Sequence, residues 1–488
     1  MEMIPKNNEK FNDFEEKTWK KLMRQGVKET QEWLRKVDEI LLRSRDKEIL
    51  KPKDVRKTTI KCRFGYVEYF RRRYEMEVNG KKTYVFLLDE YLEIANIGQY
   101  SQSIVDMVIR ECVEKSYRET SKTISKDTEI SMTHTAARGI VLKVSEKIQA
   151  MENEKAKLYE RGELEGRVKR EIIYCEHDGI YFSVQDRKNN KAKRKGERLK
   201  REAKIGVIHE GKEKRYEQDK KLINKQIVAT IGSAKQFKKL MDVEIGTKYD
   251  ESSIKKIIVN GDGAEWTHSI VERTKEIFQL DMAHIQKKIY DAVKDETYRK
   301  KMREIVYTSK PEEVFNIIWN YKVELEYDKK LDELEKVNEL EKYLKNNEDG
   351  IQRYQYKLGL KEEEIERILD KYPTLGTEES QMYCCCRKRM KRNRTSWSLE
   401  GAEAMLKVIS YVKSNEIDNL ITGKMKEKIE EELAQRVPEP KKIKKVKTHK
   451  MLYASTNSII ENVEGWKKLR IKNLLRDKKC SELMLIGS

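Results

Sequence analysis

The sequence predicts a mixed α/β protein of several domains, and three observations indicate this class. The chain has 488 residues, 38% of them hydrophobic, which is enough to build more than one core. Between residues 172 and 281, short apolar runs typical of strands alternate with short helical segments. On both sides of this part, hydrophobic residues recur every three or four positions, as they do in amphipathic helices.

The region before residue 165 is predicted to contain helices around a small β module. Residues 11–50 carry hydrophobic side chains at helical spacing. Residues 58–74 alternate apolar and basic side chains around Gly65, so we expect β-hairpins with a basic outer face. Residues 98–150 return to helical periodicity with a break at 127–131.

Within that helical stretch the pattern is typical of a helix-turn-helix. Residues 116–124 and 131–143 form two helical patterns joined by a turn, and Ser131 and Thr133 can cap the second helix. In a helix-turn-helix, the start of the second helix enters the major groove of DNA. The residues predicted to read the groove are Thr133, His134 and Arg138. An ordinary pair of packed helices explains the same spacing.

The middle of the chain follows the order β-β-β-α-β-α-β. The strands are expected around residues 172–184, 204–210, 226–231, 256–262 and 278–281, and the helices at 233–241 and about 265–277. This is the order of a ribonuclease-H-like domain, in which the first strand lies beside the fourth. Asp178 belongs to the first strand and Asp262 ends the fourth, each next to a glycine. The sequence therefore predicts a ribonuclease-H-like core in which these two aspartates meet.

Two carboxylates on buried strands predict a metal site. A buried carboxylate is unfavourable unless a cation or hydrogen-bond donors meet it. Mg²⁺ prefers oxygen ligands, and two such ions a few Å apart promote phosphodiester cleavage and transfer. We expect two Mg²⁺ ions, replaceable by Mn²⁺, and a third acid from a later helix. Asp-Gly is also a common turn signal, so either motif alone is weak evidence.

The charge balance favours a nucleic-acid partner. Lys and Arg number 105 against 85 Asp and Glu, a net charge of +20. Basic runs occupy 187–204, 387–394 and 441–450, although a solvated surface explains any one of them. The candidate phosphate contacts are Lys193, Arg194, Lys195, Arg387, Lys388, Arg389, Lys391 and Arg392.

Cellular location is predicted from apolar runs and cysteines. No apolar run reaches the roughly 20 residues of a membrane span, so we expect a cytoplasmic, nucleoid-associated protein. The seven cysteines form no CxxC pair, and the adjacent Cys384–Cys386 cannot all face one ion, so zinc is not expected.

Short motifs occur along nearly the whole chain, at residues 56–73, 85–90, 116–119, 176–181, 259–266, 278–284 and 375–405. Taken together, these motifs resemble a known family, the bacterial ISLre-type insertion-sequence transposases, which are similar in plan to Mutator-like DDE transposases. The triple cysteine at 384–386 departs from what we expect of the family.

The resemblance implies a DDE triad at Asp178, Asp262 and Glu379. The third position stays open, because Glu378 is adjacent and Glu400 and Glu403 follow. Such an enzyme would bind terminal inverted repeats of double-stranded DNA, cleave the ends with metal ions, and transfer the freed 3′ ends to target DNA. Because two ends must be paired, a homodimer or higher oligomer is expected. A nuclease without strand transfer and a silent DNA-binding relic are the alternatives.

Three further side chains are candidates near this site. His284 could contact the scissile phosphate or orient a water molecule, and a packing role is the alternative. Trp266 and Trp397 could stack on an unpaired base, and core packing is the alternative for both.

The predicted domains follow from these patterns. They are an N-terminal helical region (1–55), a basic β module (56–97), the helix-turn-helix region (98–165), the first part of the core (166–281), a helical insertion (282–372), the C-terminal core helices with the third acid (373–436) and a basic tail (437–488).

Overall fold

The computed structural model describes most of the chain and divides it into two compact units. The described residues are 10–78, 81–92, 99–164, 166–185, 199–216, 219–271, 274–367, 373, 375–376, 386–391 and 395–417. One unit extends to Val144 and the other runs from Ser145 to Ile417. Each has its own hydrophobic core. The prediction of a mixed α/β protein is confirmed.

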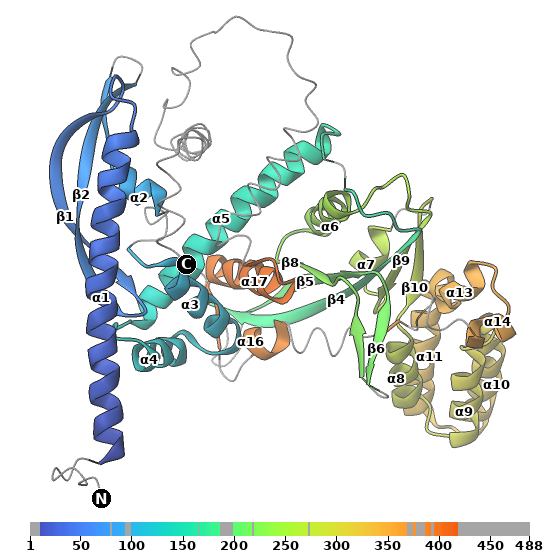
Figure 1. Cartoon of the computed structure of the whole chain (residues 1–488). Helices are drawn as coiled ribbons and strands as arrows, with labels where there is room; N and C mark the ends of the chain where they lie inside the picture. Colours follow the sequence, from blue (N-terminus) through green and yellow to red (C-terminus); the bar gives the residue numbers. More distant parts are fainter. Residues whose placement is uncertain are drawn as a thin grey trace, which may run out of the picture. The chain divides into compact units, whose positions relative to one another are not determined.

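The first unit begins with a long helix that packs on an antiparallel sheet. Helix α1 (Phe11–Ser44) is followed by β1 (Lys51–Cys62), β2 (Gly65–Val78) and β3 (Lys81–Val85), in the order β1-β2-β3. Leu34, Val37 and Leu41 of α1 belong to the same buried cluster as the strand residues Val67 and Tyr69. The helical pattern of 11–50 and the hairpins around Gly65 are therefore confirmed (Figure 1).

The described part of the first unit contains four more helices. They are α2 (Leu87–Tyr91), α3 (Gln102–Glu114), α4 (Tyr117–Asp127) and α5 (His134–Glu160), the last of which continues into the second unit. Ser116 and Glu119 form a capping box at the start of α4. Thr133 Oγ1 accepts a hydrogen bond from the Ala136 amide at 3.1 Å and so caps α5. The Ser131 amide instead donates to the Tyr66 hydroxyl at 3.1 Å.

A five-stranded mixed sheet is the centre of the second unit (Figure 1). Its strands are β4 (Ile172–Val184), β5 (Leu199–His209), β8 (Gln226–Thr230), β9 (Lys256–Gly261) and β10 (Glu276–Leu280). Their order in space is β10-β9-β4-β5-β8. The pairs β4–β5 and β5–β8 are antiparallel, whereas β4–β9 and β9–β10 are parallel. The first predicted strand therefore lies beside the fourth.

Two details of this region differ from the prediction. A hairpin, β6 (Lys212–Tyr216) and β7 (Asp219–Leu222), comes between β5 and β8 and was not expected. Its strands are rich in lysine and lack the apolar alternation by which strands are recognised. Helix α7 (Glu265–Ser269) is shorter than the predicted 265–277, because Glu276 already pairs with β9 as part of β10.

Helices cover the sheet and follow it. Helix α6 (Ala234–Lys248) buries Phe237 and Met241 in the same cluster as Cys175 and Ile208 of the sheet. The helices after β10 are α8 (Met282–Ala292), α9 (Glu296–Ile305), η2 (Pro311–Glu313), α10 (Val314–Tyr327), α11 (Leu331–Asn346), α12 (Glu348–Ile351), α13 (Tyr354–Lys357), α14 (Glu362–Arg367), α16 (Lys388–Met390) and α17 (Leu399–Lys413). The predicted helical character of 282–372 is thus confirmed where that stretch is described. Within the described parts of the chain, no helix is both long and apolar enough to span a membrane.

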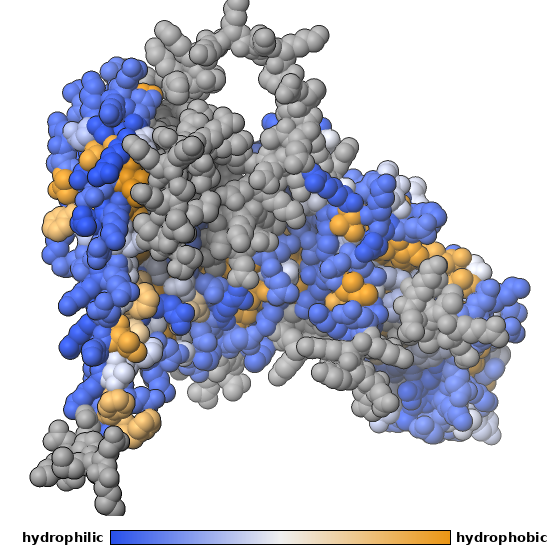
Figure 2. Space-filling view, in the orientation of Figure 1, coloured by the Kyte–Doolittle hydropathy of each residue, from blue (hydrophilic) through white to orange (hydrophobic). Residues whose placement is uncertain are grey.

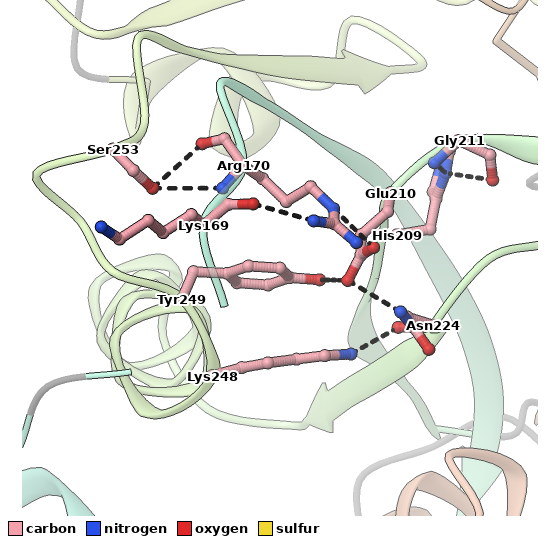
Figure 3. Close-up of polar contacts among 9 residues, drawn as sticks. All are labelled: Lys169, Arg170, His209, Glu210, Gly211, Asn224, Lys248, Tyr249 and Ser253. Carbon is pink, nitrogen blue, oxygen red and sulfur yellow. Dashed lines mark hydrogen bonds and ion pairs between the residues drawn. The ribbon is translucent and has the colours of Figure 1, made fainter. Parts of the chain in front are cut away.

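The buried carboxylate of Glu210 connects three chain segments at the end of the sheet where β4 begins (Figure 3). Glu210 follows β5 and accepts hydrogen bonds from Arg170 Nε at 2.8 Å, Asn224 Nδ2 at 2.9 Å and the Tyr249 hydroxyl at 3.1 Å. Burial, followed by the charge of Glu210, raises the pKa of Tyr249, so this hydroxyl remains a donor. These bonds connect the segment before β4, the turn after β5 and the end of α6.

Candidate active site

Three aspartates lie at the same level of the sheet, on or after three neighbouring parallel strands. In the register, His177 of β4 is opposite Gly261 of β9, and Leu280 of β10 is opposite the same glycine. Each of these three residues is followed directly by an aspartate: Asp178, Asp262 and Asp281. The structure therefore brings the two predicted aspartates together and adds Asp281, which sequence reasoning treated only as the end of the last strand.

Asp178 is a buried carboxylate with a raised pKa. It is 4% exposed, and its Oδ1 accepts the Gly179 amide at 2.6 Å. Burial is the main cause of the raised pKa; the positive charge of Arg387 opposes it, and the negative charge of Asp262 reinforces it. The interaction with Asp262 means that two like charges lie close together, an arrangement that a cation would stabilise.

Asp262 sits in the turn that follows β9. Its Oδ1 accepts a hydrogen bond from the Ala264 amide at 2.9 Å, and its backbone carbonyl accepts one from the Tyr343 hydroxyl at 2.9 Å. Gly263 has φ +79°, and a Cβ there would lie 2.7 Å from a Leu280 methyl group, so this turn requires glycine. The Asp-Gly motif is a turn signal here, and it also directs the carboxylate beside Asp178.

Asp281 and His284 form a hydrogen-bonded pair at the start of α8. Asp281 Oδ2 accepts from the His284 amide at 3.0 Å, as a helix cap, and from His284 Nδ1 at 2.5 Å. That hydrogen bond is the main cause of the raised pKa of His284, and the charges of Asp262 and Asp178 raise it further. Burial opposes ionisation of Asp281, but the bonds and charge of His284 outweigh it, so the pKa of Asp281 is lowered.

The ionisation of this pair has a defined pH range. The interaction of the Asp281 carboxylate with His284 stabilises the folded protein above the usual pKa of an aspartate. This stabilisation is lost as the pH falls through the lowered pKa of Asp281. It is also lost when the pH rises through the raised pKa of His284. The pair therefore favours the imidazolium form of His284, whose pKa is raised further by the charges of Asp262 and Asp178.

Arg387 brings a distant part of the chain to the site. Its Nη2 lies 3.3 Å from Asp178 Oδ2, and the Asp178 side chain is 5% exposed. Lys388 and Lys391 are exposed nearby in sequence, and burial and then the charge of Arg387 lower the pKa of Lys391. Arg389 differs from the prediction of a phosphate contact, because it is 3% exposed and its guanidinium lies 4.7 Å from the centre of the Trp397 ring.

The candidates for the third acid have different positions. Glu378 and Glu379 lie outside the described residues. Glu403 is held at the edge strand, where it accepts from Thr230 Oγ1 at 2.9 Å and from the Ile231 amide at 2.8 Å. Glu400 is exposed in the first turn of α17.

The two tryptophans are packed side chains. Trp397 is 6% exposed and donates from Nε1 to the Met390 carbonyl at 3.1 Å, which leaves its ring no open face for a base. Trp266 is half-buried, stacks near His177 with ring centres 6.4 Å apart, and donates to Glu202 Oε1 at 3.2 Å.

The predicted DNA-contacting residues of α5 are accessible in part. Thr133 and His134 are exposed at the start of the helix, whereas Arg138 is half-buried. Lys193, Arg194, Lys195 and Arg392 lie outside the described residues, as does the basic run 441–450.

Sequence reasoning missed a buried polar pair between the strand that carries Asp178 and its neighbour β5. Glu176 and His209 are both fully buried, with Glu176 Oε1 3.2 Å from His209 Nε2. His209 Nδ1 lies 3.1 Å from the Gly211 amide nitrogen and 3.2 Å from the Gly211 carbonyl oxygen, so both ring nitrogens have polar partners. The sequence signal for this pair was the charged residue Glu176 within an apolar strand. The pairing itself could not be predicted, because it depends on the register of β4 against β5, in which Tyr174 lies opposite His209.

The described side chains satisfy part of a magnesium site. Asp178 and Asp262 supply the carboxylate oxygens that Mg²⁺ prefers, and a cation would offset both causes that raise the pKa of Asp178. Within the residues described by the structure, no three His, Cys, Asp or Glu side chains form a cluster able to hold a metal ion. A complete site would therefore need a ligand from elsewhere in the chain.

Comparison with known proteins places the chain in a family. Residues 5–428 match the model of "Uncharacterised protein family (UPF0236)". UPF0236 protein TTE2489 of Caldanaerobacter subterraneus subsp. tengcongensis is 26% identical over 398 residues, which is 81% of this chain and 76% of that protein. UPF0236 protein TTE1650/TTE2708 of the same organism is 26% identical over 376 residues, 76% of this chain and 67% of that protein. A third relative there, whose name joins eleven designations from TTE0033 to TTE2212, is 26% identical over 398 residues, 81% of this chain and 75% of that protein. The chain therefore belongs to the UPF0236 family.

Proposed function

We propose that the chain is a DDE-type DNA transposase that cleaves the ends of an insertion sequence and joins them to target DNA. The observation that carries the proposal is the position of Asp178 and Asp262 on neighbouring parallel strands of a sheet ordered β10-β9-β4-β5-β8. This order, with antiparallel pairs on one side of β4 and parallel pairs on the other, is the one expected of a ribonuclease-H-like core. In such a core the two carboxylates would belong to the metal site.

Chain geometry favours Glu379 or Glu378 as the third acid. A Cβ on Gly376 would lie 3.1 Å from Asp281 Oδ1, so residue 376 is beside the site. Glu378 and Glu379 follow Gly376 in the sequence by two and three residues. Arg387, on the far side of the same segment, is paired with Asp178. Glu403 is less suitable, because its carboxylate already accepts hydrogen bonds at the end of β8.

The roles of the side chains follow from their charges. Two Mg²⁺ ions held by Asp178, Asp262 and Glu379 would supply activation of the attacking hydroxyl and stabilisation of the leaving oxygen. The hydrogen bond to Asp281 favours the protonated form of His284, which would add positive charge where a scissile phosphate would lie. Arg387 adds a second positive charge beside Asp178.

Two further observations support a mobile element. The name of one relative joins eleven designations in a single organism, and a sequence that occurs many times in one genome is what a transposing element produces. The net charge of +20 suits a protein whose substrate is DNA. The exposed Thr133 and His134 at the start of α5 are the residues we assign to recognition of the terminal repeats.

The proposal is tested with the variant Asp262→Asn. We expect it to bind duplex DNA carrying the repeats that flank the gene as tightly as the wild type, and to lose Mg²⁺-dependent nicking by at least about a thousandfold. The asparagine keeps the size of the side chain but removes the charge that holds the metal. The matched control is Asp332→Asn, on the exposed first turn of α11, which should nick normally. Undiminished nicking by Asp262→Asn would remove this residue from the site.

A joining assay separates transposition from simple cleavage. The wild-type protein is given a pre-cleaved 3′ end and a target plasmid, and we expect covalent joining of the two. Nicking without joining would identify a nuclease of the same fold. DNA binding with neither reaction, in Mg²⁺ or Mn²⁺, would identify a silent DNA-binding relic and overturn the proposal.

A further inference from the structure

One face of the β1–β2 hairpin is exposed and carries aromatic side chains. The residues of the opposite pleat belong to the buried cluster of the first unit, and they are Ile60, Cys62, Val67 and Tyr69. The alternate residues of the two strands point the other way. Among these, Phe70 is 63% exposed and Tyr66 is 44% exposed. Figure 2 shows hydrophobic residues interspersed over β1 and β2 on a mostly hydrophilic surface.

The strand register places a lysine opposite each of these two rings. Lys57 of β1 is opposite Phe70 of β2, and Lys61 is opposite Tyr66. Residues directly opposite in an antiparallel pair share a face, with their Cβ atoms about 5 Å apart. The Lys61 ammonium lies 5.8 Å from the centre of the Tyr66 ring. Glu68 shares the face and forms an ion pair with Lys57 at 2.7 Å. Each exposed ring is therefore accompanied by a cation.

The sheet that carries this face is strongly basic. Residues 51–85 include eleven Lys or Arg and four Asp or Glu. A surface of this charge attracts a polyanion. Proteins that bind single-stranded nucleic acid combine such a charge with aromatic rings on which unpaired bases stack. In duplex DNA the bases stack on one another about 3.4 Å apart, so their flat faces are not accessible to the rings. The combination of charge and exposed rings therefore favours an unpaired strand.

We propose that this face of β1 and β2 binds single-stranded DNA, with bases stacked on Phe70 and Tyr66 and phosphates beside Lys57 and Lys61. The two rings are four residues apart on one strand, a distance of about 13 Å, so the bases on them would not be stacked on each other. Every base has a flat face, so the binding is expected to depend little on sequence.

Tyr66 also connects this face to the start of α5. Its hydroxyl accepts a hydrogen bond from the Ser131 amide at 3.1 Å and donates to the Ser131 carbonyl at 3.4 Å. Thr133 and His134, which we assign to the terminal repeats, follow within three residues. If the proposed function holds, the strand bound here would be an opened end of the same DNA. The single-strand binding itself requires no cleavage, so it can be tested separately from transposition.

The first test compares oligo(dT) of about 20 nucleotides with duplex DNA of the same length, by fluorescence anisotropy with the full-length protein. We expect Phe70→Ala to weaken oligo(dT) binding by about tenfold or more, because one stacked base is lost, and to leave duplex binding unchanged. Unchanged duplex binding also shows that the variant is folded. Phe70→Leu should lose affinity as Phe70→Ala does, because it is apolar without an aromatic face, whereas Phe70→Trp should retain it.

The matched control for the ring is Tyr327→Ala. Tyr327 is 88% exposed at the end of α10, where Glu326 and Asp328 flank it in the sequence. A polyanion is not expected to bind beside these two acids, so the variant should bind oligo(dT) as the wild type does.

The second test examines the phosphate contact with Lys61→Gln. The slope of log affinity for oligo(dT) against log salt concentration should become shallower by about 0.7, the contribution of one phosphate of a single strand. The matched control is Lys330→Gln, which removes an exposed lysine paired with Asp328 at 2.8 Å and should leave the slope unchanged.

Three results would overturn the proposal: a wild type that does not bind oligo(dT), oligo(dT) affinity that neither Phe70→Ala nor Lys61→Gln lowers, and equal losses for oligo(dT) and duplex DNA in Phe70→Ala. Failure of the proposed function looks different. In that case the joining of DNA ends is absent while oligo(dT) binding still responds to these two substitutions.

Discussion

Adjacent residues on β4 have opposite electrostatic environments. Asp178 is accompanied by Arg387, whereas His177 is packed among Phe237 and Trp266. Neither ring nitrogen of His177 has a hydrogen-bond partner among the described residues. Burial is the main cause that lowers the pKa of His177 to about 3, and the charge of Lys238 adds to it. His177 is therefore held neutral, directly beside a carboxylate that is charged or metal-bound in the proposed reaction.

The lowered pKa predicts that acid destabilises the protein through His177. A histidine that is neutral when folded stabilises the fold above its unfolded pKa of 6.5, and this is lost as the pH falls toward about 3. At about pH 5 the loss amounts to about 2 kcal/mol. We expect His177→Leu to remove that part of the decline in free energy of unfolding between about pH 7 and about pH 5, as measured by urea denaturation.

The exposed His134 provides a matched control for that experiment. His134→Gln should retain the wild-type dependence on pH, because the side chain is already in water. Identical pH profiles for His177→Leu and the wild type would contradict the predicted neutral state.

At the residue scale, the sequence predicts what local chemistry determines. Asp178 and Asp262 are recognisable because each interrupts or ends an apolar run. Asp281 was not identified as a site residue, since its relation to Asp262 depends on the register of β10 against β9. The pairing of Arg387 with Asp178, 209 residues apart, has no local signal at all.

Among the elements, α5 and α6 are joined by a buried ion pair. Lys155 Nζ lies 3.1 Å from Glu244 Oε2, with side-chain exposures of 1% and 15%. Glu244 also accepts from Gln226 Nε2 at 2.9 Å, so the pair connects both helices to β8. Burial opposes the charge of Lys155, but Glu244 outweighs it and the pKa of Lys155 is raised. The lysine therefore remains charged inside the unit.

We expect Lys155→Ala to destabilise the protein by about 3–5 kcal/mol, because it leaves Glu244 buried without its counter-charge. The double variant Lys155→Met with Glu244→Gln should recover at least half of that loss, as measured from urea denaturation midpoints. The control variant is Lys239→Ala, which removes an exposed ion pair with Glu160 between the same two helices. It should not measurably alter the urea denaturation midpoint. A loss no larger than that of the control would contradict the buried-pair argument.

The sequence predicts the elements better than their partners. Hydrophobic periodicity identifies α1 and the five strands of the sheet because burial on one side imposes it. The β6–β7 hairpin was missed because lysine-rich strands carry no such pattern. The length of α7 was wrong because pairing of β10 with β9 ends it early.

On the scale of the whole molecule, the excess of basic residues predicts strongly salt-dependent DNA binding. If about six phosphates are neutralised, the affinity for duplex DNA should fall about a thousandfold between about 50 and about 200 mM salt. The measurement is a series of binding titrations with repeat-containing DNA and with scrambled DNA of the same length. Comparable slopes with different affinities are expected, because phosphate contacts are independent of sequence. Affinity that is insensitive to salt would contradict the assignment of the charge to DNA.

The mixed α/β class and the position of the first core strand beside the fourth could be predicted, because they follow from the succession of patterns along the chain. The third acid of the proposed site could not be chosen from the sequence, because Glu378, Glu379, Glu400 and Glu403 are all candidates there. The division of the chain after Val144 has no sequence signal either, since it falls inside a continuous helix.

The end of β4 is hydrogen-bonded to residues that are synthesised much later than the strand itself. The Gln185 amide donates to the Trp397 carbonyl at 2.7 Å, and the Trp397 amide donates to the Ser183 carbonyl at 3.0 Å. Gln185 Nε2 also reaches the Ser396 carbonyl, 211 residues away, at 3.1 Å. A ribosome adding about 5 to 20 residues per second needs roughly 10 to 40 seconds to make that interval. A nascent chain therefore carries Asp178 for roughly 10 to 40 seconds before the residues that bond to the end of its strand exist.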